Sequence, residues 1–219
     1  MNGDSRAEIL RRVRQALAVT SDGGAPGGEP PERGYLTVHA ERTADERVDL
    51  LAENLTDYRA AVHRTDAAGL PATIARLLAE HGSRSVVVPE RAPRGWLPEV
   101  EAAGIEVLND GTPLPAARLD TVDSVVTGCA VAVAETGTIV LDAGPDQGRR
   151  LLTLIPDHHV CVVRVPEQVV DSVPQALPRL DPARPLTWIS GPSATSDIEL
   201  SRVEGVHGPR TLDVVLVTP

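Results

Sequence analysis

The residues best placed for chemistry lie in the segment Ala134–Thr138, which puts a carboxylate two residues before a glycine and the apolar run that follows it. If that run is a strand, Glu135 lies in a turn beside it, and glycine-containing turns at strand ends let the backbone approach a ligand. One interpretation makes Glu135 a general base or nucleophile, with Thr136, Gly137 and Thr138 holding an anionic substrate. The other makes its carboxylate a structural group that hydrogen-bonds to amides of the turn.

A second candidate is the segment SGPSATSD over residues 190–197, which follows a predicted strand and precedes a helix-like stretch. Free amides and hydroxyls at the start of a helix bind phosphate or carboxylate groups. The candidate anion-binding residues are Ser190, Gly191, Ser193 and Thr195. The alternative is helix capping by Ser193, Thr195 or Ser196, with Asp197 complementing the helix dipole.

Histidines offer a third kind of site. His158 and His159 open a predicted strand, so their side chains should point to opposite faces and cannot easily bind one metal together. One of them could join Asp197, Glu199 and His207, but no HxH or HExxH spacing supports a metal site. We therefore expect no metal and no other cofactor, and place His207 with the residues that bind substrate.

Arginines follow the turn at residues 144–148. The guanidinium group of Arg149 or Arg150 matches a carboxylate in a forked pair, and we take Arg149 as a candidate substrate-binding residue. The alternative is an exposed arginine in a loop.

Composition narrows the function classes. The chain has 219 residues, a net charge of −10 and no Phe, so an aliphatic core and no nucleic-acid partner are expected. Its two cysteines, Cys129 and Cys161, cannot ligate an iron–sulfur cluster alone. No signal peptide, membrane span, GxGxxG motif or P-loop is evident, which predicts a soluble, cytoplasmic protein without a hydride-accepting cofactor.

The elements that must position these groups alternate between helices and strands. Residues 1–34 are predicted to form an amphipathic helix over 5–18 and a flexible linker rich in Gly and Pro, followed by one domain over 35–219. A capping box at Thr43 predicts a helix through about Leu55, and further helices are expected from Pro71 to Gly82 and over Leu97–Ala103. Predicted strands are Tyr58–Arg64, Ser85–Val88, Ile105–Leu108, Ser124–Thr127, Thr138–Leu141, Val160–Val165, Leu186–Ser190 and Leu212–Val217.

Continuous apolar strands alternating with helices predict an α/β domain with a mostly parallel sheet and helices on both faces. From about Thr121 onward we expect one open sheet. Its crevice should gather the Glu135 turn, the 190–197 segment and His207.

Four segments carry a resemblance to a known family. They read TGCAVAVAETGTIVL over 127–141, GRRLLTLIPDHH over 148–159, SGPSATSDIE over 190–199 and GVHGP over 205–209. In this order they resemble the LUD (lactate utilization) domain family, most strongly over residues 120–219. Ala130 departs from the pattern, which favours Asp there, so any polar role of that position is absent.

The resemblance implies a fold related to the NagB/RpiA/CoA-transferase-like group. It also implies a role in oxidising L-lactate to pyruvate beside two partner proteins that carry iron–sulfur clusters, with a small carboxylate or anion bound in a cleft. The cysteine count agrees with that division of labour. Two alternatives stay open: an independent enzyme of the CoA-transferase or sugar-phosphate isomerase kind that uses Glu135, and a purely structural or regulatory subunit.

Overall fold

The computed structural model describes residues 3–22, 34, 36–195, 203–204 and 208–219. The chain divides into two units, Met1–Tyr35 and Leu36–Pro219. The first unit contains helix α1 (Gly3–Asp22), which is longer at both ends than predicted and exposes the apolar side chains of Ile9 and Val13. Most of the predicted linker, residues 23–33, lies outside the described residues, so the linker remains a prediction.

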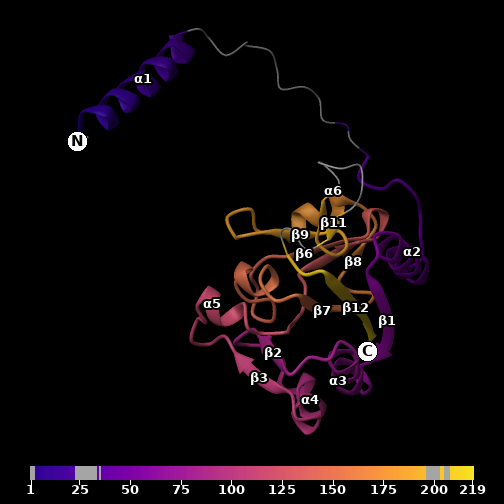
Figure 1. Ribbon diagram of the computed structural model, residues 1–219. Helices are drawn as coiled ribbons and strands as arrows, with labels where there is room; N and C mark the ends of the chain where they lie inside the picture. Colours follow the sequence, from indigo (N-terminus) through magenta and orange to yellow (C-terminus); the bar gives the residue numbers. More distant parts are fainter. Residues whose placement is uncertain (1–2, 23–33, 35, 196–202, 205–207) are drawn as a thin grey trace. The chain divides into compact units, whose positions relative to one another are not determined.

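The second unit is built on a six-stranded sheet in the order β1-β12-β7-β4-β2-β3, in which every neighbouring pair is parallel (Figure 1). This confirms the predicted α/β class with a mostly parallel sheet. The strands are β1 (Ala61–Asp66), β2 (Ser85–Val88), β3 (Glu106–Asn109), β4 (Ser124–Thr127), β7 (His158–Arg164) and β12 (Thr211–Thr218).

The expectation of one open sheet from Thr121 onward is wrong. A second, four-stranded sheet has the order β8-β5-β6-β9, with antiparallel β5–β6 and β6–β9 pairs. A strand buried on both faces is apolar whether its neighbours run parallel or antiparallel, so the apolar runs could not reveal the separate sheet. Its strands are β5 (Val131–Val133), β6 (Thr138–Leu141), β8 (Val169–Val170) and β9 (Thr187–Ile189).

The segment after Ser193 also differs from expectation, because Ala194–Thr195 is a strand, β10, and not the start of a helix. It pairs antiparallel with β11 (Val203–Glu204). The capping interpretation for Ser193 therefore lacks its helix, whereas a helix capped by Thr195 or Ser196 would begin outside the described residues. The 196–202 stretch, including Ser196 and Asp197, lies outside the described residues.

The helices cover the parallel sheet on both faces. The capping box at Thr43 is present, with the Thr43 hydroxyl accepting the Glu46 amide and the Glu46 carboxylate accepting the Thr43 amide. No described helix is both long and apolar enough to cross a membrane. The helices are α2 (Ala44–Asp57), α3 (Leu70–Glu80), α4 (Pro98–Ala102), α5 (Ala116–Leu119) and α6 (Val173–Ala176), with short 3-10 helices η1 (Arg94–Trp96), η2 (Ala134–Thr136), η3 (Arg150–Thr153) and η4 (Leu177–Arg179).

Strand β12 shows how the two faces divide the core. Leu212, Val214 and Leu216 join the core cluster of α2 and the second sheet, whereas Val215 and Val217 join that of α3 and α4. The α6 helix packs on the far face of the second sheet, against residues of β5 and β6. Because aliphatic side chains alternate along each central strand, the chain fills both layers without phenylalanine.

A chain of buried polar groups crosses the amino ends of the parallel strands. His158 Nδ1 lies 2.9 Å from Ser124 Oγ, and His158 Nε2 lies 2.8 Å from Asp213 Oδ2. The other Asp213 oxygen lies 2.5 Å from His63 Nε2. Burial raises the pKa of Asp213, but the hydrogen bonds from His158 and His63 outweigh burial and hold the pKa below its ordinary value.

Removing this carboxylate should therefore weaken the fold. We expect Asp213→Ala to lower the free energy of unfolding by about 3 kcal/mol at pH 7, because it leaves two histidines without their shared acceptor. Because the folded-state pKa is depressed, the contribution of Asp213 is complete above about pH 4 and is lost as pH falls through the folded-state value. The difference in the free energy of unfolding between wild type and Asp213→Ala should therefore become smaller at acidic pH.

Urea titrations monitored by circular dichroism at several pH values measure both effects. Asp49→Ala is the control, since the exposed Asp49 pairs with the exposed Arg64 and should cost less than about 1 kcal/mol. A loss at Asp213 no larger than the loss at Asp49, or one that does not change with pH, would contradict the account.

Candidate functional site

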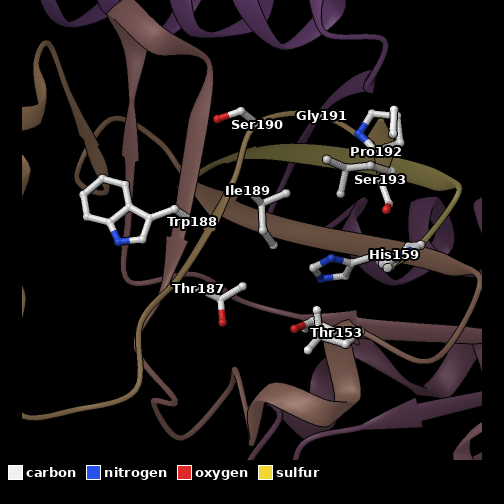
Figure 2. A pocket seen from close by; sticks show the side chains of 14 residues that line it. Thr153, His159, Thr187, Trp188, Ile189, Ser190, Gly191, Pro192 and Ser193 are labelled. Carbon is white, nitrogen blue, oxygen red and sulfur yellow. The ribbon is translucent and has the colours of Figure 1, made fainter. Parts of the chain in front are cut away.

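A cleft of about 250 Å³ lies between β9, the turn that follows it, η3 and the amino ends of β7 and β12; we call it the Ser190 cleft (Figure 2). Four hydroxyl side chains line it, those of Thr153, Thr187, Ser190 and Ser193. Apolar groups, among them Ile189, complete the wall. A small concave site with a few polar groups on an apolar wall is the usual form of a small-molecule site.

His159 supplies the imidazole ring in this cleft, and Figure 2 shows it facing Ile189 with Thr153 nearby. The ring is almost completely buried, and its Nε2 lies 2.8 Å from the hydroxyl of Thr127 on the neighbouring strand. His158 lies on the opposite face of β7, as predicted from strand alternation, so the two rings do not share a site.

The wall of the cleft is held by close backbone packing. Gly191 has a φ of +82°, and a Cβ at this position would collide with the carbonyl oxygen of Tyr58. The amide of Ser193 donates to the carbonyl of Pro209 over 2.8 Å, which ties the turn to the segment that leads into β12. Glycine at 191 is therefore needed for both the left-handed conformation and the approach to Tyr58.

Glu135 lies in η2, and it is not among the residues that line the Ser190 cleft. Its carboxylate accepts hydrogen bonds from His39 Nδ1 at 2.6 Å and Arg42 Nη1 at 3.0 Å, and Arg42 also reaches Asp171 at 3.3 Å. Burial raises the pKa of Glu135, but the bonds from His39 and Arg42 outweigh it and hold the pKa below its ordinary value. The carboxylate is thus engaged with side chains from far along the chain, not with amides of its own turn.

The other residues of the turn contact one another and the cleft. The Gly137 amide donates to the Ala134 carbonyl over 3.3 Å, and a Cβ on Gly137 would meet the backbone of Asn54 in α2. Thr136 donates its hydroxyl to Thr138, whose hydroxyl lies 2.8 Å from that of Ser190. The Thr138–Ser190 pair is thus the link between the Glu135 turn and the Ser190 cleft.

Arg149 does not line the Ser190 cleft. It lines a separate cavity with Arg91 and Arg184, and its guanidinium forks onto Asp110 with contacts of 2.6 and 2.9 Å. Thr195 belongs to β10, and its side chain is outside the described part. His207, Asp197 and Glu199 lie outside the described residues.

The structure also identifies residues that sequence motifs did not indicate. His39, Arg42 and Asp171 surround Glu135, and Thr153 and Thr187 line the Ser190 cleft. Thr153 lies within the 148–159 motif but was not singled out there, and the other four belong to none of the quoted motifs, because each reaches its site through the tertiary fold. In the described part of the chain, no group of three or more His, Cys, Asp or Glu side chains could hold a metal. Cys129 and Cys161 are buried and free.

The Ser190 hydroxyl suits binding more than nucleophilic attack. A nucleophilic serine needs an adjacent base, and among the described residues the partner of the Ser190 hydroxyl is the hydroxyl of Thr138. Hydroxyl groups and an imidazole can instead donate to the oxygens of a small ligand.

The family model of the LUD domain matches residues 48–217. The chain belongs to the LUD domain family. The match extends well before residue 120, into helix α2, and therefore covers both sheets. It confirms the relationship that the four sequence motifs indicated.

Two relatives and one solved structure illustrate the kinship within the LUD domain family. The chain is 45% identical to lactate utilization protein C of Deinococcus radiodurans, over 98% of this chain and 96% of the relative. It is 26% identical to lactate utilization protein C of Bacillus subtilis, over 80% of each. A crystal structure of a DUF162 family protein from Deinococcus radiodurans has a TM-score of 0.68 and 43% identity, covering 81% of this chain and 99% of that one.

The wall of the Ser190 cleft can be tested with two glycines that both have positive φ. Gly82, at +76°, has open space where a Cβ would lie, whereas Gly191 faces the Tyr58 backbone. We expect Gly82→Ala to lower the free energy of unfolding by about 1 kcal/mol, from backbone strain alone. Gly191→Ala should cost about 1–3 kcal/mol more, because the backbone must also move. Chemical denaturation of both variants measures the difference, and equal losses would show that Gly191 does not pack as described.

Proposed function

We propose that the chain is a non-cluster component of a cytoplasmic system that oxidises L-lactate to pyruvate, and that it binds a small carboxylate in the Ser190 cleft. The relatives named lactate utilization protein C support the pathway. The observation that carries the binding site is the combination of His159 with hydroxyl side chains in one small cleft. Lactate and pyruvate present carboxylate oxygens that such donors match.

The two cysteines support the proposal that the partner proteins, and not this chain, carry the iron–sulfur clusters. Both are buried, so neither presents a thiolate for cluster assembly at the surface. The electrons released by lactate would then pass to partner proteins that carry iron–sulfur clusters, while this chain holds substrate or product. A structural or regulatory subunit with an idle cleft is the alternative that a failed binding test would favour.

The proposed assembly is tested by purifying the tagged chain from cells grown on lactate. We expect the isolated chain to contain no iron, and the purified complex to contain iron and acid-labile sulfide in partner subunits identified by mass spectrometry. A chain that supports lactate oxidation without any cluster-bearing partner would contradict the proposal and favour an independent enzyme.

The alternative enzyme would use Glu135 as its nucleophile or base. The contacts of Glu135 with His39 and Arg42 favour a structural role, since both carboxylate oxygens are already occupied. We expect Glu135→Gln to retain growth on lactate and Thr187→Phe to abolish it, because a phenyl ring on edge strand β9 would fill the Ser190 cleft. The growth rate of a deletion strain complemented with each variant measures this.

The control for the bulky change is Thr56→Phe, at an exposed position of α2 that does not line the cleft. It should grow like wild type. Loss of growth with Glu135→Gln, in a variant whose unfolding free energy is unchanged, would overturn the assignment and support chemistry at Glu135.

A further inference from the structure

A second cavity, of about 500 Å³, lies at the carboxyl ends of β2 and β3. Glu90 and Arg91 follow β2, Asp110 follows β3, and the loop over residues 143–149 forms the opposite side. We call it the Arg91 cleft. It shares no lining residue with the Ser190 cleft.

Its position in the topology is one that favours ligand sites. From β2 the chain moves outward to the edge strand β3 and then returns across β2 to β4, so the strand order reverses at β2. In open parallel sheets, ligands bind beyond the carboxyl ends of strands at such a reversal. The Ser190 cleft, by contrast, adjoins the amino ends of β7 and β12.

Two arginines in this cleft are held in place by carboxylates. Arg149 uses Nε and Nη2 on Asp110, a side chain that is only 5% exposed, and Nη2 also donates to the Leu114 carbonyl. Arg184 donates from Nη1 to Asp142 over 2.7 Å. Among the described residues, these contacts leave Nη1 of Arg149, and Nε and Nη2 of Arg184, as donors for a ligand.

Arg91 is the third guanidinium. Within the described part of the chain it has no hydrogen-bond or ion-pair partner. Asp110 and Asp142 balance Arg149 and Arg184, so the positive charge available to a ligand comes from Arg91. Of the two acidic residues that line the cleft, Asp110 contacts Arg149, whereas Glu90 contacts no arginine among the described residues. The donors come from three separate segments of the chain.

We propose that the Arg91 cleft binds a small molecule through a phosphate group, held by Arg91, Arg149 and Arg184. A terminal phosphate offers three oxygens in different directions, which suits guanidinium groups from three segments better than a planar carboxylate does. The cleft is larger than phosphate alone, so the rest of the ligand lies against Pro113, Pro145 and the Glu90 side. This site is additional to the carboxylate site of the proposed function.

The test is a calorimetric titration of the full chain with inorganic phosphate at constant ionic strength. We expect saturable binding with a dissociation constant below about 10 mM. Arg91→Ala should weaken it about tenfold to a hundredfold, the loss expected for one charged hydrogen-bonding partner. Arg76→Ala, which removes an exposed arginine of α3 that pairs with Glu80, should leave it unchanged.

The proposals for the Arg91 cleft and the Ser190 cleft can be disproved independently of each other. Thr187→Phe should leave phosphate binding intact, and L-lactate should not displace phosphate. Arg91→Ala should keep the wild-type circular dichroism spectrum, because its side chain contributes no hydrogen bond or ion pair within the described fold. Absence of saturable binding, equal affinity in wild type and Arg91→Ala, or an equal effect of chloride would overturn the phosphate site.

Discussion

The constraint on which the structure depends is the burial of the C-terminal strand β12 between β1 and β7. Its register joins the first strand of the sheet to the strand that carries both His158 and His159. Its side chains alternate between the two core layers, so neither layer closes without it. At its amino end, Leu212 lines the Ser190 cleft and Asp213 binds His158 in the buried polar chain. The same strand therefore helps to position both the cleft and the buried polar chain.

Much of the fold could be predicted from local pattern. Ser85–Val88, Ser124–Thr127 and Thr138–Leu141 are strands with the predicted bounds, and the capping box at Thr43 begins its helix where expected. These elements depend on periodicity and on contacts within a few residues, which the sequence displays directly. The assignment of these strands to two sheets depends on pairing between distant segments, and an apolar run does not indicate which strand it will pair with.

The candidate sites were less predictable, for the same reason. Local spacing indicated Ser190, Gly191 and Ser193, which do line one cleft. It could not indicate that His39 and Arg42 would engage Glu135, or that Arg149 would face a different cavity with Arg91 and Arg184. Charge pairs across long sequence separations are set by the tertiary fold. Only the structure could therefore show that the Glu135 carboxylate is already hydrogen-bonded while the Arg91 guanidinium is available to a ligand.

The two clefts differ both in their polar groups and in their position on the parallel sheet. The Ser190 cleft offers hydroxyls and an imidazole at the amino ends of the parallel strands, and the Arg91 cleft offers guanidinium groups at the carboxyl ends. The most direct test of carboxylate binding is an NMR titration of the labelled chain with L-lactate and with pyruvate. The account predicts saturable shifts at the amides of Gly191 and Ser193 and at the His159 ring; shifts confined to Arg91 and Arg149, or none that saturate, would contradict it.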